Sequence, residues 1–262
     1  FFAAVCDKQA SLISKWMSLG FVHGVMNTDN MTISGETIDY GPCAFIDDYD
    51  PKTVFSSIDH HGRYSYNNQP TIMIWNLTKF AESLIPLIHE ETEKSVKQLT
   101  EVLQLVIPSY KEYFYKEFSK KLGLSKMDNK EIKIIEDYLK ILKSNSIDFT
   151  KSFRDLSKIY FNIIDVKESV FLNAKDFTNW YKEWNHRLDP KIIKEINSIN
   201  PSYIPRNHII ENALMHSTNN DDSKIRELIK VISQPFEEVS GYEDFASPSK
   251  INRGRYVTYC GT

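Results

Sequence analysis

From residue 71 onward the sequence repeats one pattern, in which apolar side chains recur three or four positions apart among Lys and Glu. This spacing gathers the apolar side chains on one face of an α-helix and predicts a mostly helical chain. Helices are predicted over 3–19, 71–88, 91–107, 109–122, 129–143, 152–163, 175–186 and 222–233. We expect Gly20 to end the first helix and Pro86 to kink or break the second. A count of nine glycines in 262 residues also favours helices over a turn-rich sheet protein.

The segment before these helices has a different character. Residues 31–39 carry β-branched side chains on both sides of Ser34-Gly35-Glu36, which predicts a short β-hairpin. Residues 41–70 read as a loop rich in Pro, Asp and Asn. The fold class is therefore α+β, mostly α. We expect residues 1–70 to carry the functional loop and the hairpin, and residues 71–262 to form a helical body with an irregular tail.

Composition excludes several classes of protein. The net charge is −3, whereas a dedicated nucleic-acid binder has an excess of basic residues. No apolar run approaches the 18 or so residues of a membrane span, so no membrane partner is expected and the chain should be soluble. The three cysteines are too few for a disulfide framework. The chain starts at Phe1 without a signal peptide and reads as one that begins inside a domain.

Three short motifs follow in order: His23-Gly24, Asp29-Asn30 and Asp39-Tyr40-Gly41. Phosphotransferases of the protein-kinase type place a base and a metal-binding Asn on one loop, and a metal-binding Asp after the next hairpin. Mg²⁺ prefers oxygen ligands and takes only one or two of them from the protein when phosphates supply others. Asn30 and Asp39 are candidate ligands, and Asp29 is a candidate base.

One position departs from the kinase pattern. Protein kinases read H-R-D-x-x-x-x-N, and aligning His23 and Asn30 with it puts Val25 where the catalytic Asp stands. Valine cannot accept a proton, so ordinary phosphoryl transfer is in doubt. The nearest carboxylate is Asp29.

The segments 23–31 and 38–45 resemble the SelO family (selenoprotein O, also called YdiU). The likeness continues through 54–60, 62–64, 68–70, 75–77, 153–156, Trp184, 187–188, 200–201, 206–207 and the Cys260 tail. It therefore spans nearly the whole chain, and Val25 belongs to the family's own pattern.

The resemblance implies a pseudokinase fold and a protein adenylyltransferase activity, in which AMP passes from ATP to Ser, Thr or Tyr hydroxyls of proteins and pyrophosphate is released. It implies that Asp29 is the catalytic base. Asn30 and Asp39 would bind Mg²⁺, with Mn²⁺ as an alternative, and through the metal ATP. The fold implied is a kinase-like C-lobe with a short catalytic hairpin and a helical extension. Family members in eukaryotes are mitochondrial, and any targeting segment would lie upstream of Phe1.

A kinase-like site also needs a Gly-rich loop, a strand Lys and a helix Glu from an N-lobe. No G-x-G-x-x-G pattern occurs in the sequence, so we expect the C-terminal part of a SelO protein with the N-lobe absent. Such a chain alone should bind ATP·Mg²⁺ weakly or not at all and should not transfer AMP.

Other interpretations stay open. The chain is alternatively an ATP-dependent kinase-like phosphotransferase or a non-catalytic helical interaction module. We expect His23 to be structural. His60 and His61 should be solvated or hydrogen-bonded rather than bind zinc, because no i, i+4 ligand spacing supports a zinc site. Trp16, Trp75, Trp180 and Trp184 are expected in the core.

The cysteines suggest one more hypothesis, since the family's C-terminal cysteine is linked to redox control. Cys43 lies four residues after Asp39, and Cys43 and Cys260 would form a redox pair that tethers the tail over the site. Two free thiols that never meet are an equally good expectation. Cys6 should be buried and inert.

Overall fold

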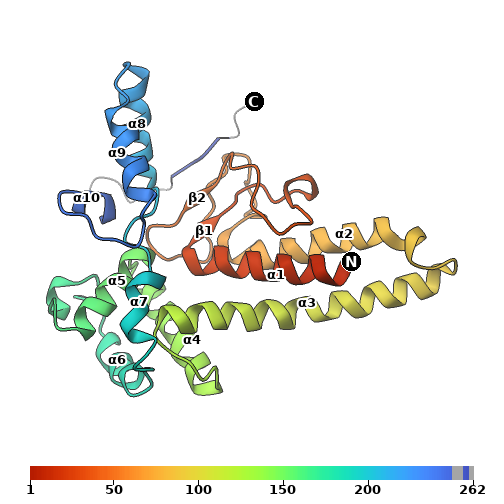
Figure 1. Cartoon of the computed structure of the whole chain (residues 1–262), viewed down its shortest axis with the longest axis horizontal. Coiled ribbons are helices and arrows are strands. Elements are labelled where there is room, and N and C mark those ends of the chain that lie inside the picture. The colour runs from red at the N-terminus through yellow and green to blue at the C-terminus, as the bar shows by residue number, and fades with distance from the viewer. Residues whose placement is uncertain (250–255, 260–262) are drawn as a thin grey trace. The chain divides into compact units, whose positions relative to one another are not determined.

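A computed structural model describes residues 1–249 and 256–259, and it is mostly helical with a small two-stranded sheet (Figure 1). This confirms the predicted α+β, mostly α class. The α-helices are α1 (Phe2–Leu19), α2 (Gln69–Ile88), α3 (Thr92–Lys121), α4 (Asn129–Ser144), α5 (Phe149–Tyr160), α6 (Phe177–Asn185), α7 (Ile196–Ile199), α8 (Asn207–Thr218), α9 (Ser223–Ile232) and α10 (Glu243–Ala246). The strands are β1 (Phe21–Val22) and β2 (Ala44–Phe45), and the 3₁₀ turns are η1 (Thr28–Asn30), η2 (Tyr66–Asn68), η3 (Val166–Glu168) and η4 (Ile193–Glu195).

The chain divides into two compact units. The first comprises Phe1–Cys43, Pro51–Glu117 and the C-terminal residues from Val257, and the second comprises Ala44–Asp50 and Phe118–Tyr256. The candidate residues Asp29, Asn30 and Asp39 all lie in the first unit.

The first unit is built around α1, which packs against α2 and hydrogen-bonds to α3. Its core side chains include Ala10 and Ile13, which have no exposed surface. The Ser14 hydroxyl donates to the backbone oxygen of Tyr110, 3.2 Å away. Gly20 ends α1 in the left-handed conformation at φ 73°, and its N–H bonds back to the last turn, as predicted.

Neither proline inside the predicted helices ends a helix. The α2 helix continues past Pro86 to Ile88, and α3 is one helix that runs through Pro108. The division into 91–107 and 109–122 is therefore wrong, and of the kink or break expected at Pro86, the break does not occur. A proline removes one N–H···O bond. The uninterrupted turns on both sides of Pro108 keep α3 continuous.

The predicted hairpin is shorter than expected. Its only ladder contact among the described residues is the antiparallel bridge between Met31 and Thr37. Gly35 turns the chain at φ 74°, and a Cβ atom at this position would lie 2.8 Å from the Cβ of Lys8 in α1. The turn is therefore pressed against α1, and only glycine fits there.

The second unit has an aromatic core formed by α4, α5 and α6. The rings of Tyr138 and Trp180 lie 4.8 Å apart, and those of Trp180 and Trp184 stack at 5.7 Å. Both indole N–H groups are satisfied, Trp180 by the backbone oxygen of Ile134 at 2.8 Å and Trp184 by that of Leu122 at 2.7 Å. These bonds fix the rings in one orientation.

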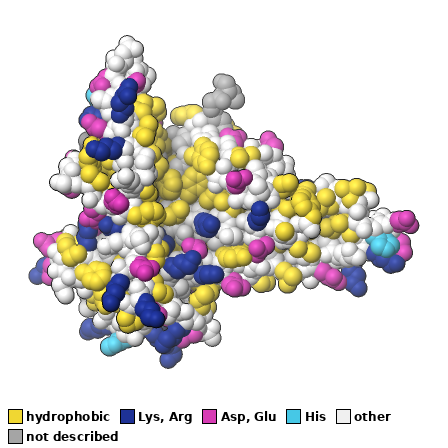
Figure 2. All heavy atoms as spheres, viewed as in Figure 1, with side chains coloured by type: hydrophobic (Ala, Val, Ile, Leu, Met, Phe, Trp, Pro, Cys, Tyr) yellow, Lys and Arg dark blue, Asp and Glu magenta, His cyan; other side chains and the backbone are white. Residues whose placement is uncertain are grey.

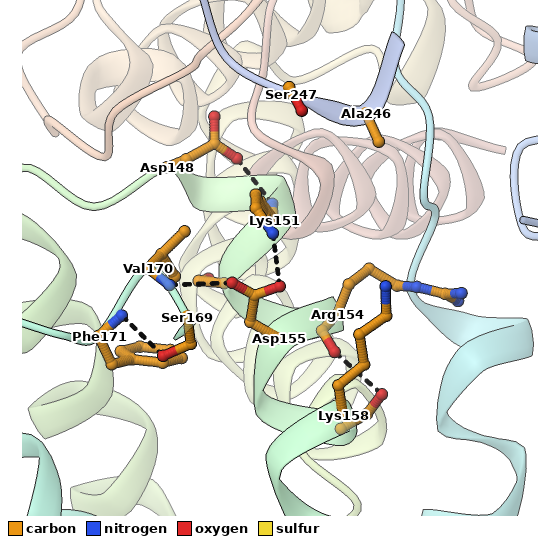
Figure 3. A network of polar contacts seen from close by, with 12 residues as sticks. Asp148, Lys151, Arg154, Asp155, Lys158, Ser169, Val170, Phe171, Ala246 and Ser247 are labelled. Atoms are coloured by element: carbon orange, nitrogen blue, oxygen red, sulfur yellow. Dashed lines mark hydrogen bonds and ion pairs between the residues drawn. The ribbon is translucent and has the colours of Figure 1, made fainter. Parts of the chain in front are cut away.

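Buried charges in the second unit are paired. The guanidinium of Arg206, only 1% exposed, donates to the carboxylates of Asp47 and Asp148. Figure 3 shows a neighbouring network on α5, in which the Lys151 ammonium and the Val170 N–H both donate to the Asp155 carboxylate, at 2.7 and 2.9 Å. Burial raises the pKa of Asp47, an effect that the Arg206 charge opposes.

Of the two packed helices α8 and α9, the sequence predicted only α9, as the helix over 222–233. The segment of α8 has no clear apolar stripe, and several of its apolar side chains face solvent, Leu214 and Met215 among them. Yellow apolar surface runs along this helix pair in Figure 2. Within the described residues, no helix is both long and apolar enough to span a membrane.

Candidate active site

The loop that carries Asp29 and Asn30 is held by its own side chains. The Asn30 amide donates to the backbone oxygen of Val25, with Nδ2 2.9 Å from that oxygen. The Asn27 N–H donates to the same oxygen, also at 2.9 Å. The Val25 side chain is buried, so the residue that replaces the kinase aspartate packs into the core. Because the Asn30 NH₂ group faces the loop backbone, its Oδ1 points the other way.

His23 is fully buried and braces this loop. Its Nε2 lies 2.8 Å from the backbone oxygen of Ile38, and its Nδ1 lies 3.4 Å from the Val25 N–H. These partners assign the neutral tautomer with the proton on Nε2. Burial lowers the pKa of His23, and the Ile38 oxygen and the Asp39 charge oppose that effect only in part. Both ring nitrogens are occupied, which confirms the predicted structural role.

Asp39 follows Ile38 in an unusual backbone conformation. Its φ is 53°, in the left-handed region that a residue other than glycine rarely adopts. The Gly41 N–H donates to its Oδ1 at 3.3 Å, and a local side-chain bond of this kind makes left-handed Asp tolerable. The bond from His23 to Ile38 and the bridge between Met31 and Thr37 set the course of the chain into Asp39.

Asp29, Asn30 and Asp39 carry carboxylate and amide oxygens, which are the ligand types that a hard divalent cation prefers. Asp29 and Asp39 are exposed carboxylates, and no lysine or arginine forms an ion pair with either one in the described part of the chain. Asn30 adds a neutral amide oxygen. No group of three or more His, Cys, Asp or Glu side chains that could enclose a metal occurs in residues 1–249 and 256–259. One or two protein ligands are enough for Mg²⁺ only where a substrate phosphate supplies the rest.

The loop after the hairpin does not offer a metal centre at Asp59, His60 and His61. The Asp59 carboxylate accepts the Arg63 and Tyr64 N–H groups at 2.9 and 2.8 Å, so it serves the loop itself. Both histidines are exposed. The Tyr64 hydroxyl donates to the Asn27 side chain at 2.6 Å and so connects this loop to the residue that precedes η1.

Gln69 and Asn76, two residues of α2 for which no role was predicted, support the loop that carries Asp29 and Asn30. Gln69, fully buried, donates to the backbone oxygen of Phe21 and accepts the His23 N–H, both at 3.0 Å. The Asn76 amide donates to the backbone oxygen of Met26 at 3.0 Å. Two signals in the sequence pointed to them: their polarity on an otherwise apolar helix face, and their place in the segments 68–70 and 75–77 that resemble the SelO family.

Trp75, on the same helix, is not in the core. It is 42% exposed, and the Arg63 guanidinium lies over its ring, 4.7 Å from the centroid. The other three tryptophans are buried as predicted. Trp75 therefore stacks under the Arg63 guanidinium rather than packing in the core, where it was expected.

Part of the C-terminal tail lies beside this region. Thr258 forms a parallel bridge with Ser56, and its hydroxyl donates to the backbone oxygen of Pro42 at 2.7 Å. Cys43 follows Pro42 and is half-buried, and burial raises the pKa of its thiol to about 11. Cys260 lies outside the described residues. Cys6 is buried, and its pKa is also raised to about 11, in agreement with an inert thiol.

The lowered pKa of His23 predicts a loss of stability in mild acid. The unfolded chain takes up this proton near the ordinary histidine pKa of 6.5, whereas the folded protein resists protonation to a lower pH. The contribution of neutral His23 to the free energy of unfolding is therefore fully present above the unfolded pKa of 6.5, and it is lost as the pH falls from there toward the lower folded pKa. Urea midpoints measured from pH 7.5 to 5 should fall less steeply for His23→Gln than for the wild type. The exposed His61→Gln should keep the wild-type slope, and equal slopes for all three proteins would contradict the assignment.

Comparison with known proteins places these residues in a family. The family described as "Protein adenylyltransferase SelO" matches residues 1–233. Proteins named "Protein nucleotidyltransferase YdiU" are similar over the chain: 41% identity for Maridesulfovibrio salexigens and 44% for Mycobacterium sp. (strain KMS), each covering 100% of this chain and 54% of the relative. The Bacillus cereus (strain ATCC 14579) protein is 42% identical over 98% of this chain and 53% of its own length. The chain thus spans about half the length of the curated relatives it matches. It belongs to the SelO family.

Proposed function

We propose that this chain carries the catalytic loop and metal ligands of a protein adenylyltransferase that moves AMP from ATP to Ser, Thr or Tyr hydroxyls of proteins. The observation that supports this most directly is the arrangement of Asn30 and Asp39. One is oriented by the Val25 oxygen and the other is set in place by the chain segment that His23 braces. Asp39 forms no ion pair with a described residue, and Asn30 offers a neutral amide oxygen, so both suit a cation carried by a nucleotide.

In the proposed reaction Asp29 accepts the proton of the attacking hydroxyl. The hydroxyl oxygen forms a bond to the α-phosphorus of ATP, and the bond between that phosphorus and the oxygen leading to the β-phosphate breaks. Pyrophosphate leaves with the bonding electrons. The exposed position of Asp29 supports this role, because the base must meet a hydroxyl on another protein.

Asn30 and Asp39 would hold Mg²⁺, which supplies charge neutralisation for the phosphates when bound. Mn²⁺ prefers similar oxygen ligands and is an alternative. The left-handed backbone of Asp39 is a strained feature of the kind that persists where function requires it.

The proposal extends to the fold. We infer that residues 1–70 serve as a kinase-like catalytic loop, hairpin and following loop, and that residues 71–262 serve as the helical body and tail of a kinase-like C-lobe. The helix–loop–hairpin order of α1, η1 and residues 31–39 supports this reading.

Metal binding gives the first test. Weak binding of ATP·Mg²⁺ should still raise the melting temperature of the chain by about 2 to 4 °C, provided that the ligand is supplied at concentrations near ten times Kd. Asp39→Ala should lose this rise, because it removes the charged ligand. The matched control Glu101→Gln, an exposed acid on α3, should retain it. The absence of any rise in the wild type would favour a non-catalytic helical module instead.

The transferred group gives the second test, best measured in the Bacillus cereus relative at the positions aligned with Asp29 and Asp39. Label from ATP marked at the α-phosphate should enter protein, and label at the γ-phosphate should not. Alanine at the position of Asp29 should reduce incorporation roughly 10²- to 10⁴-fold, the usual effect of losing a general base. Incorporation of the γ-label would identify a kinase-like phosphotransferase and overturn the proposal.

We further propose that Cys43 and Cys260 form a reversible disulfide. The hydrogen bond from Thr258 to Pro42 supports this, because it joins the residue before Cys43 to a residue two positions before Cys260. Burial raises the pKa of Cys43 to about 11, so this thiol is mostly protonated at neutral pH and is itself a weak nucleophile. An oxidant such as a diazene or a peroxide would take up the two electrons and two protons that the thiols release.

Mass spectrometry after treatment with diamide should therefore find one peptide pair linked through Cys43 and Cys260. Thr258→Val should slow its formation by removing the hydroxyl that holds the tail. Cys6→Ser is the matched control and should not affect it. Recovery of both thiols in free form from the oxidised wild type would contradict the pairing.

A further inference from the structure

The exposed part of the loop that carries Asp29 is attached to another segment through the side chain of Asn27. Residues 27–29 are all exposed. The Tyr64 hydroxyl donates to the Asn27 side chain, with its oxygen 2.6 Å from Oδ1. Within residues 1–249 and 256–259 this is the one side-chain hydrogen bond that reaches residues 27–29. The hydroxyl of Tyr64 is therefore the polar contact that fixes where this stretch lies.

Asn27 passes this attachment on to η1 through its backbone. Its N–H donates to the Val25 oxygen at 2.9 Å, and its own oxygen accepts the Asn30 N–H at 3.0 Å. The Asn30 side chain donates to the same Val25 oxygen, also at 2.9 Å. A shift of Asn27 would strain both backbone bonds and move the turn between them. The place of Asp29 thus follows from the place of Asn27.

Tyr64 is itself held from two directions. The carboxylate of Asp59, only 7% exposed, accepts the backbone N–H groups of Arg63 and Tyr64 at 2.9 and 2.8 Å. The Arg63 guanidinium lies over the ring of Tyr64 and over that of Trp75 in α2, 5.6 and 4.7 Å from their centroids. A cation that faces two rings attracts both of them. The hydroxyl of Tyr64 is therefore presented to Asn27 by a loop that is fastened to a 20-residue helix.

We propose that Tyr64 is a positioning residue for the Asp29-Asn30 pair. Its hydroxyl holds Asn27 and so orders the turn that carries both side chains, although Tyr64 bonds to neither of them. An exposed base without a hydrogen bond of its own is held in a productive geometry only if its backbone is fixed. The inference rests on the proposed function for the roles of Asp29 and Asn30, but it concerns the order of the turn and is measured without nucleotide.

Amide exchange with solvent, measured by NMR on the whole chain, tests the proposal. Tyr64→Phe removes only the hydroxyl, and exchange of the Asn30 N–H should become about three- to tenfold faster, as expected for the loss of one hydrogen bond. The N–H of Ile13, in the buried part of α1, should exchange as in the wild type. The matched control Tyr113→Phe removes a hydroxyl that donates to Asp7 at 2.8 Å, and it should leave exchange at Asn30 unchanged.

Substitution of the acceptor provides a second, independent measurement. Asn27→Ala should speed exchange at Asn30 as Tyr64→Phe does, and the double variant should add nothing further, because the same bond is lost in each case. Asn27→Asp keeps an acceptor for the hydroxyl and should retain the slow exchange of the wild type.

Three results would overturn the proposal: unchanged exchange at Asn30 in Tyr64→Phe, equal acceleration at Ile13, or multiplied effects in the double variant. None of them bears on whether AMP is transferred, which the labelling experiment decides. Failure of the positioning role and failure of the proposed function are therefore told apart.

Discussion

The buried imidazole of His23 is the contact on which the arrangement of residues 23–39 depends. One ring nitrogen holds the backbone of Val25 and the other holds Ile38, the residue before Asp39. Gln69 fixes the backbone of His23 itself from the start of α2. Positions far apart in the sequence are thereby joined through one neutral ring. Protonation of Nδ1 would break its bond to the Val25 N–H. Burial lowers the pKa of His23 and so keeps the ring neutral and this bond in place.

Val25 stands where protein kinases have an aspartate, and it contributes to the loop through its backbone. Valine at position 25 cannot take a proton, but its side chain fills the core and its oxygen orients Asn30. The backbone thus does the positioning, while the carboxylates of Asp29 and Asp39 remain exposed. In the proposed adenylyltransferase the side chain of Val25 and its backbone oxygen therefore have separate roles, one in the core and one in orienting Asn30.

Much of the fold followed from local signals, and the exceptions have physical causes. The apolar spacing identified α1, α2, α4 and α9, and Gly20 marked a helix end, because these features depend on neighbours in sequence. The continuity of α3 through Pro108 did not follow, since turns on both sides outweigh one lost bond. Asp29, Asn30 and Asp39 stood out by motif. The supporting roles of Gln69 and Asn76 were missed because their partners are backbone atoms that only the folded chain brings near.

Gly24 leaves room for the backbone of Pro42, to which the C-terminal tail is bonded. A Cβ atom at this position would lie 2.7 Å from the backbone oxygen of Pro42, the same oxygen that accepts the Thr258 hydroxyl. Any larger residue at position 24 would displace that oxygen and the tail contact together, without touching Asp29 or Asp39. The segment at Pro42 and the tail at Thr258 thus both require glycine at position 24. A substitution at Gly24 would therefore detach Thr258 from Pro42 in a protein that still carries Asp29 and Asp39.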